Sequence, residues 1–178
     1  YLGFNMKRIQ TYCLGLISLL LYPGCDKTTS QKFPEGGERP AQAMANTISY
    51  IDNVEDSYSF EIGLTLQFAV PGKITQLGGR LAERCVCKIS LWDYDTKQKI
   101  DSVFITIDDI RRFAYAEIDP VTVNAGDKFV VSVNTYPKRD YFVFYSPADY
   151  DILPLTFGNI TIVEKRSNDS DDFSFPER

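Results

Sequence analysis

The feature that most constrains this chain is a strict alternation of residues from Phe60 to Val70, which reads FEIGLTLQFAV. Successive side chains point to opposite faces of a β-strand, so this period of two predicts a half-buried strand. The face predicted to meet a core carries Phe60, Ile62, Leu64, Leu66, Phe68 and Val70. The face predicted to meet solvent carries Glu61, Gly63, Thr65, Gln67 and Ala69. Pro71 and Gly72 are turn residues that end the strand.

Signals for further strands continue from about Ile48 to the end of the chain. Short apolar or alternating segments recur about every 8–12 residues, separated by turn residues. The predicted strands lie within residues 73–79, 84–92, 100–107, 112–118, 120–136, 141–146 and 160–163. No segment combines a helical period with capping residues. This pattern predicts an all-β fold, a single antiparallel β-sandwich (immunoglobulin-like or jelly-roll-like) over residues 48–166, with a polar tail at 167–178.

An export signal is predicted at the N-terminus. Met6, Lys7 and Arg8 form a basic start, and the apolar segment 12–22 follows them. The apolar run is about 10 residues long, whereas a membrane-spanning helix needs about 20. Residues 1–24 are therefore predicted to be a signal peptide, with Met6 as the expected initiator.

The residues that end this segment, Leu21 to Cys25 (LYPGC), are similar to the lipobox of bacterial lipoproteins. The resemblance implies cleavage before Cys25, diacylation of its thiol, and a lipid anchor in the outer membrane or at the cell surface. Tyr22 and Pro23 depart from the stricter lipobox pattern, and simple secretion is the alternative. Residues 25–47 are polar and show no sustained apolar period, which predicts a lipidated cysteine followed by a flexible linker.

The composition excludes several classes of function. The chain has 19 basic and 24 acidic residues and a net charge of −5, which argues against a nucleic-acid partner. It has no histidine, so histidine-based acid–base catalysis and histidine-ligated metals are excluded. Pairs of acidic residues are too common here to indicate a glycosidase without a placed cleft. We therefore expect this protein not to be an enzyme.

Three segments of the predicted sandwich resemble an uncharacterised family of bacterial extracellular β-sandwich domains. They are GLTLQFAVPGKITQLGG at 63–79, KISLWDYDTKQKI at 88–100 and PVTVNAGDKFVVSVNT at 120–135. The resemblance implies an immunoglobulin-like module of a secreted or surface protein, of the kind found beside carbohydrate-active or adhesive modules. No catalytic residues come with it.

The expected function is that of a non-catalytic cell-surface lipoprotein module that binds glycan or protein. The alternative is a structural or adhesive subunit of a surface assembly, pilus-like, in which strands pair between chains. An accessory module of a hydrolase, or an enzyme, is the least favoured class.

An aromatic cluster after residue 135 supplies the candidate ligand site. By alternation, Tyr141 and Tyr145 share one face of the strand at 141–146. Phenylalanine is less costly to bury than tyrosine, so the face that carries Phe142 and Phe144 is predicted to be core. The predicted ligand-binding residues are therefore Tyr136, Arg139, Tyr141 and Tyr145. The alternative is that these rings pack at a sheet edge.

Two further groups of residues could hold a metal. Cys85 and Cys87 lie two apart on one strand, so free thiols, a strained disulfide and a metal site all remain open. Asp93 and Asp95 are weak candidates for Ca²⁺ ligands, and aspartate is equally common in turns. No other cofactor is expected.

Overall fold

The structure of this protein is a computed structural model that describes residues 37–47, 50–54, 59–137, 141–145, 153–169 and 173–177. For residues 50–54, 141–145 and 169 it describes the backbone alone. The predicted signal peptide and Cys25 lie outside these ranges. No helix within them is long and apolar enough to cross a membrane.

Strands make up most of the described chain, and a short helix, α2, precedes them at Pro40–Thr47. The strands are β1 Tyr50–Val54, β2 Phe60–Phe68, β3 Gly72–Gly79, β4 Cys85–Asp93, β5 Lys99–Ile107, β6 Ala114–Val123, β7 Lys128–Asn134, β8 Tyr141–Tyr145, β9 Leu155–Phe157 and β10 Ile160–Asp169. The alternating and apolar segments of the sequence thus form strands, as their period of two predicts.

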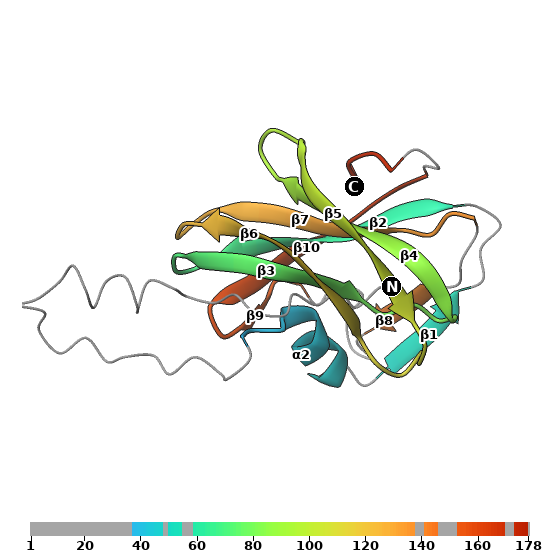
Figure 1. Ribbon diagram of the computed structural model, residues 1–178. Helices are drawn as coiled ribbons and strands as arrows, with labels where there is room; N and C mark the ends of the chain where they lie inside the picture. The colour runs from blue at the N-terminus through green and yellow to red at the C-terminus, as the bar shows by residue number, and fades with distance from the viewer. Residues whose placement is uncertain are drawn as a thin grey trace, which may run out of the picture.

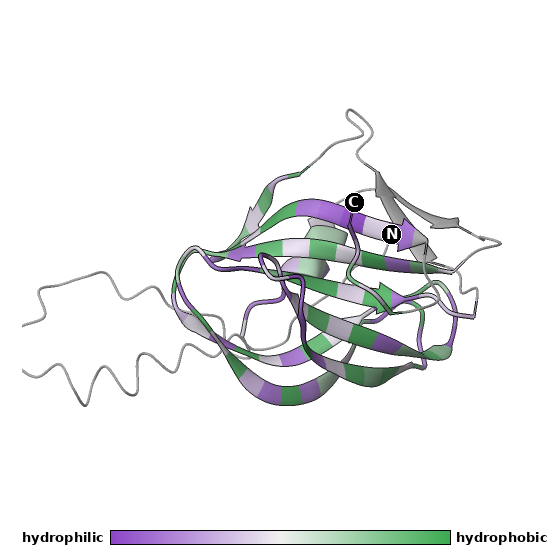
Figure 2. Ribbon diagram, turned by 90° about the horizontal axis from the view of Figure 1, so that it is seen from above, coloured by the Kyte–Doolittle hydropathy of each residue, from purple (hydrophilic) through white to green (hydrophobic). Residues whose placement is uncertain are grey.

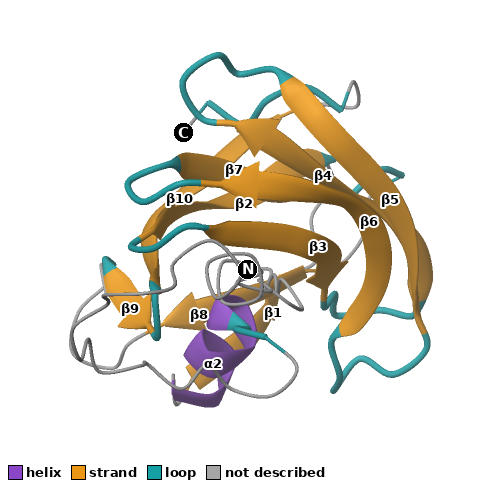
Figure 3. Cartoon of the chain, turned by 60° about the vertical axis from the view of Figure 1, so that its left-hand side comes forward, coloured by secondary structure: helices purple, strands orange, loops and turns teal. Residues whose placement is uncertain are grey.

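The strands form one six-stranded sheet, in the order β5-β4-β7-β2-β10-β9, and two two-stranded sheets, β3-β6 and β1-β8. Every pairing is antiparallel. In Figure 1, β3 and β6 lie across the large sheet, and in Figure 3 that sheet forms the layer above β3, α2 and the β1–β8 pair. This layered antiparallel arrangement confirms the predicted all-β, sandwich-like class.

The core lies between these layers. Hydrophobic and hydrophilic residues alternate along several of the strands coloured in Figure 2, as expected where a strand turns one apolar row inward. The inner face of β2 confirms the prediction for Ile62, Leu64, Leu66 and Phe68. Other strands add buried residues to the same cluster, among them Ile74, Leu77, Cys87, Ile89, Leu91, Ile105, Ile107, Val123, Phe129, Val131, Val133, Ile160 and Ile162.

The second face of β2 differs from the prediction. Glu61 and Thr65, which we expected to face solvent, are both 0% exposed. Strand β2 lies at the centre of the six-stranded sheet, between β7 and β10, where neighbouring side chains reach over it from both sides. The prediction of a half-buried strand is therefore wrong, because this strand is covered on both faces.

The predicted flexible linker is wrong over its last eight residues, which form α2. Ala41 and Met44 are three residues apart, so they share one face of the helix, and both are buried in the core. Pro40 takes the first helical position, where its missing N–H costs nothing. Eight residues make about two turns, which are too few for the helical period to stand out in the sequence.

The predicted polar tail also packs against the sandwich. Strand β10 continues to Asp169, and beyond it Phe175 and Pro176 are buried. Phe175 contacts Trp92 and Val130 on the side of the large sheet that faces away from the core. A few apolar residues are enough to hold a polar segment against the sheet. Composition alone therefore did not predict that the tail packs.

Candidate functional site

The face of the six-stranded sheet that is turned away from the core, here called the outer face, carries a buried polar cluster. The strand register pairs Glu61 with Asn134 on one side and with Asn168 on the other. Ser132 is paired with Ser90 and with Gly63. These cross-strand neighbours bring polar side chains from β2, β4, β7 and β10 together.

Glu61 is the centre of this cluster. The hydroxyl of Ser132 donates to Glu61 Oε1, and Asn134 Nδ2 donates to Glu61 Oε2 at 2.9 Å. The indole Nε1 of Trp92 donates to Ser132 Oγ at 2.7 Å, which orients the hydroxyl toward the carboxyl group. All four side chains are buried. Each of these four side chains thus has a hydrogen-bond partner, as buried polar groups require.

Burial raises the pKa of Glu61 because it disfavours the charged form, although the hydrogen bonds from Ser132 and Asn134 and the charges of Lys88 and Lys99 oppose this. The folded protein therefore holds the Glu61 proton at a higher pH than the unfolded chain does. The contribution of Glu61 to stability is therefore complete below the pKa of the unfolded chain. It is lost as pH rises through the pKa of the folded protein.

We expect acidification from about pH 7 to below the unfolded pKa of 4.5 to stabilise the wild-type protein relative to the Glu61→Gln variant, which lacks this titrating group. Urea unfolding of both proteins at the two pH values measures the difference. A difference in unfolding free energy that stays constant, or that moves in favour of the variant at low pH, would contradict the assigned direction.

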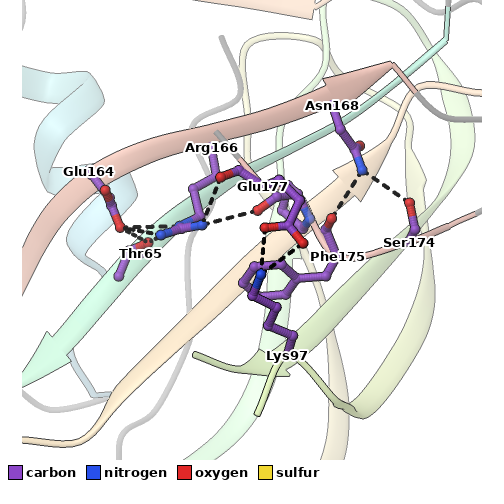
Figure 4. A network of polar contacts seen from close by, with 9 residues as sticks. Thr65, Lys97, Glu164, Arg166, Asn168, Ser174, Phe175 and Glu177 are labelled. Atoms are coloured by element: carbon purple, nitrogen blue, oxygen red, sulfur yellow. Dashed lines mark hydrogen bonds and ion pairs between the residues drawn. The ribbon is translucent and has the colours of Figure 1, made fainter. Parts of the chain in front are cut away.

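A second polar group lies beside the first on the outer face (Figure 4). Thr65 Oγ1 donates to Glu164 Oε1 at 3.1 Å, and Arg166 contacts both residues, with Nε 3.0 Å from Thr65 Oγ1 and Nη2 2.8 Å from Glu164 Oε1. Burial acts to raise the pKa of Glu164, but the hydrogen bond and charge of Arg166 outweigh it and lower that pKa. Arg166 is thereby held in one orientation toward the end of the chain.

An open cleft lies on another part of the molecule, between α2 and the β9–β10 turn. Its volume is about 510 Å³. The cleft, here called the helix cleft, is lined by Gly37, Glu38, Arg39, Gln42, Ala43, Asn46, Phe157 and Gly158. Concave sites of this size, with a ring and a few polar groups, are typical of ligand binding.

The polar groups of the helix cleft come from one stripe of α2. Arg39, Gln42 and Asn46 are three and four residues apart, which places them on one side of the helix. The guanidinium of Arg39 lies 5.4 Å from the centre of the Tyr115 ring. Tyr115 also donates from its hydroxyl to Gln42 Oε1 at 3.0 Å. These contacts with β6 hold two of the three side chains in place.

Glu38 closes the floor of the helix cleft. Its carboxylate accepts hydrogen bonds from Asn159, from the backbone N at 3.1 Å and from Nδ2 at 2.7 Å. Gly158 has φ +62°, and a Cβ there would lie 2.7 Å from Glu38 Oε1. Glycine is therefore favoured at this turn by its conformation, and a side chain there would also displace the Glu38 carboxylate.

The structure describes only part of the predicted aromatic site. Tyr136 lies in the turn after β7 and is 52% exposed, and its backbone N donates to Asn134 Oδ1 at 2.8 Å. Tyr141 and Tyr145 are the ends of β8, paired with Val54 and Tyr50 of β1. Their side chains, and all of Arg139, lie outside the described part of the chain. The predicted grouping of these four residues stays a prediction.

Asp93 has the hydrogen bonds of a turn residue. Its Oδ1 accepts from the backbone N and from the hydroxyl of Thr96, at 2.7 and 2.8 Å, and these bonds lower the pKa of Asp93. Asp95 lies exposed in the same turn. Within the described ranges, no group of three or more Cys, Asp or Glu residues could hold a metal ion.

No disulfide joins Cys85 and Cys87 in the structure. Cys87 faces the core and is buried, and Cys85 is half-buried. The structure thus speaks against the strained disulfide among the three alternatives that the sequence left open.

Sequence reasoning missed the residues of both sites. Glu61 was assigned to solvent, although a lone carboxylate within an apolar strand is a signal that could have marked it. Arg39, Gln42 and Asn46 fall within the predicted linker, where their spacing of three and four is the signal that was available.

A comparison with protein-family models gives no match to this chain. Neither a curated protein nor a solved structure matches it. The functional argument therefore depends on the geometry of the two sites.

Proposed function

We propose that this protein is a non-catalytic module of a lipid-anchored bacterial surface protein, and that it binds a glycan in the helix cleft. The observation that carries the proposal is the arrangement of Arg39, Gln42 and Asn46 along one helical stripe of the cleft wall that Phe157 also lines. The resemblance to extracellular sandwich modules and the lipobox-like segment that ends at Cys25 support the cellular location.

The chemistry of the cleft suits a saccharide. Amide and guanidinium groups offer donors to sugar hydroxyl groups, and the amides also offer acceptors. The ring of Phe157 offers an apolar surface for the C–H face of a sugar. Because the cleft is open and its polar groups are neutral except for Arg39 and the internally bonded Glu38, it suits a segment of a longer, uncharged glycan.

We expect the double variant Gln42→Ala with Asn46→Ala to bind its glycan at least about 10-fold more weakly than the wild-type protein, since each lost hydrogen bond costs about 1 kcal/mol. Retention of the chain without residues 1–24 on a glycan array identifies the ligand, and titration calorimetry measures the loss. Thr156→Ala, next to Phe157 but absent from the cleft lining, is the matched control and should bind normally. If the double variant binds the glycan as tightly as the wild-type protein does, the helix cleft is not the glycan site.

The anchor is tested in a separate experiment on the full chain. Intact-mass analysis of a bacterial membrane fraction should find the chain beginning at a diacylated Cys25. Recovery of the chain wholly in the soluble fraction, with an unmodified Cys25 thiol, would remove the anchor from the proposal and leave the glycan site standing.

The alternative function is a structural or adhesive subunit that polymerises through its strands. It is favoured by the nine-residue strand β5 at the edge of the large sheet, with which no further strand pairs in the described chain. Unpaired strand edges can accept a strand from another chain. Polymerisation that grows with protein concentration would support this alternative over the binding module.

A further inference from the structure

The end of the chain, Phe173–Glu177 (FSFPE), lies on the outer face without joining a sheet, and we call it the terminal segment. Figure 4 shows its contacts with the strands beneath it. These contacts involve both the side chains and the main chain of the segment. The segment therefore lies on the outer face as a bound peptide would.

Phe175 is the anchor of the terminal segment. Its side chain is 7% exposed, and its ring meets the ring of Trp92 edge-on, with 5.9 Å between centroids. Two cations lie against the same ring, the Arg166 guanidinium at 5.4 Å and Lys97 Nζ at 5.8 Å. A second aromatic contact joins Phe173 to Lys88, with Nζ 5.0 Å from the ring centre. A buried ring among cations and an indole is a strong anchor.

The main chain of the segment is recognised by two side chains of β10. Asn168 Nδ2 donates to the carbonyl oxygen of Phe175 and to Ser174 Oγ, each at 3.0 Å. Arg166 Nη1 donates to the carbonyl oxygens of Pro176 and Glu177, at 3.4 and 3.2 Å. Contacts to backbone carbonyls depend on the course of the main chain and require no particular side chains.

An acidic group completes the recognition. Lys97 Nζ donates to both carboxylate oxygens of Glu177, at 2.9 and 2.7 Å. Both side chains are about half exposed, so this ion pair is weak and sensitive to salt. The segment therefore depends chiefly on Phe175, with Glu177 adding selectivity.

The groups that hold the segment are positioned by the sandwich itself. Glu164 and Thr65 fix Arg166, and Ser132 fixes the Trp92 indole. The main core cluster includes no residue of the terminal segment. The binding surface is thus built on paired strands and does not need the segment for its shape.

From this arrangement we infer that the outer face is a peptide-recognition surface for a segment with an aromatic residue, a proline and an acidic residue in succession. The terminal segment occupies this surface within the chain. A partner protein that presents such a segment binds there by displacing it. This interaction is separate from glycan binding, because the helix cleft is built by α2 and the β9–β10 turn.

The test uses the full chain with Phe175→Ala and Glu177→Gln, which weaken the internal segment and leave the surface intact. Trp92 is the single tryptophan of the protein, so its fluorescence reports on the surface directly. Adding an end-capped FSFPE peptide should give a saturable change. The wild-type chain should need at least about 10-fold more peptide, because a linked segment competes at an effective concentration of about millimolar.

Two controls test whether the binding of the peptide is specific. A peptide with alanine in place of its second phenylalanine should not bind, and Asn168→Ala in the same variant should weaken binding of the FSFPE peptide at least about 5-fold. Equal binding of both peptides, or no saturable change in a folded variant, would overturn the inference. Dimerisation of the variant, seen as a doubled mass, would also overturn it, because the occupant would then be a second copy of the chain.

Should the variant fail to fold, hydrogen exchange of the wild-type protein decides the question. The amides of the terminal segment should exchange at least about 100-fold faster than those of β2, and added FSFPE peptide should increase the opening. Exchange of the segment at the rate of the core would mean that it opens only when the whole protein unfolds, and this result would overturn the inference.

Discussion

Replacing Leu66 with alanine is expected to lower the free energy of unfolding by about 2–5 kcal/mol. Leu66 is 2% exposed, and its backbone neighbours are Phe129 of β7 and Ile162 of β10, both buried in the same cluster. The change removes buried methyl groups and leaves a cavity at the centre of the large sheet. Urea or thermal unfolding, followed by circular dichroism, measures the loss.

Two neighbouring residues are controls for Leu66→Ala. Gln67 is partly exposed, so Gln67→Ala should cost less than about 1 kcal/mol. Thr65→Ala should fall between the two, since it leaves Glu164 and Arg166 without a buried hydrogen-bond partner. Equal losses for Leu66→Ala and Gln67→Ala would contradict the assigned core.

Replacing Trp92 with alanine is expected to cost about 3–5 kcal/mol, a loss typical of large buried aromatic side chains. The indole is 4% exposed and packs against Val130 and Phe175, and its Nε1 donates to Ser132. The variant therefore loses packing on the outer face and leaves the buried Ser132–Glu61 pair without its indole donor. Equilibrium unfolding in urea measures the change.

Trp92→Phe separates the two contributions. It keeps an aromatic ring against Phe175 but removes the donor to Ser132, so it should cost about 1–2 kcal/mol. A loss as large as that of Trp92→Ala would mean that the hydrogen bond, not packing, dominates the stability of the outer face.

The two proposed sites can be tested independently because they lie on opposite sides of the molecule. Figure 1 places α2 on one side of the layered sheets and the end of the chain on the other, and Figure 3 agrees. Variants of Gln42 and Asn46 should therefore leave peptide binding unchanged. Variants of Phe175 and Asn168 should likewise leave glycan binding unchanged.

The sequence by itself determined most of the strands, although β1 and β9 were not predicted and β6 joins two predicted segments. The period of two in β2 predicted that Leu64 and Leu66 share a buried face. Such predictions succeed because the alternation of side chains is a local property of the strand backbone.

Only the tertiary structure decided what covers the other face of each strand. Glu61 is buried beside Ser132 and Asn134 of β7, and Thr65 beside Glu164 and Arg166 of β10, side chains that lie about 70 and 100 residues later in the chain. Helix α2 likewise packs where Met44 can reach the core. The period of a strand tells which residues share a face, but the cover of that face depends on contacts between distant segments, which no local pattern encodes.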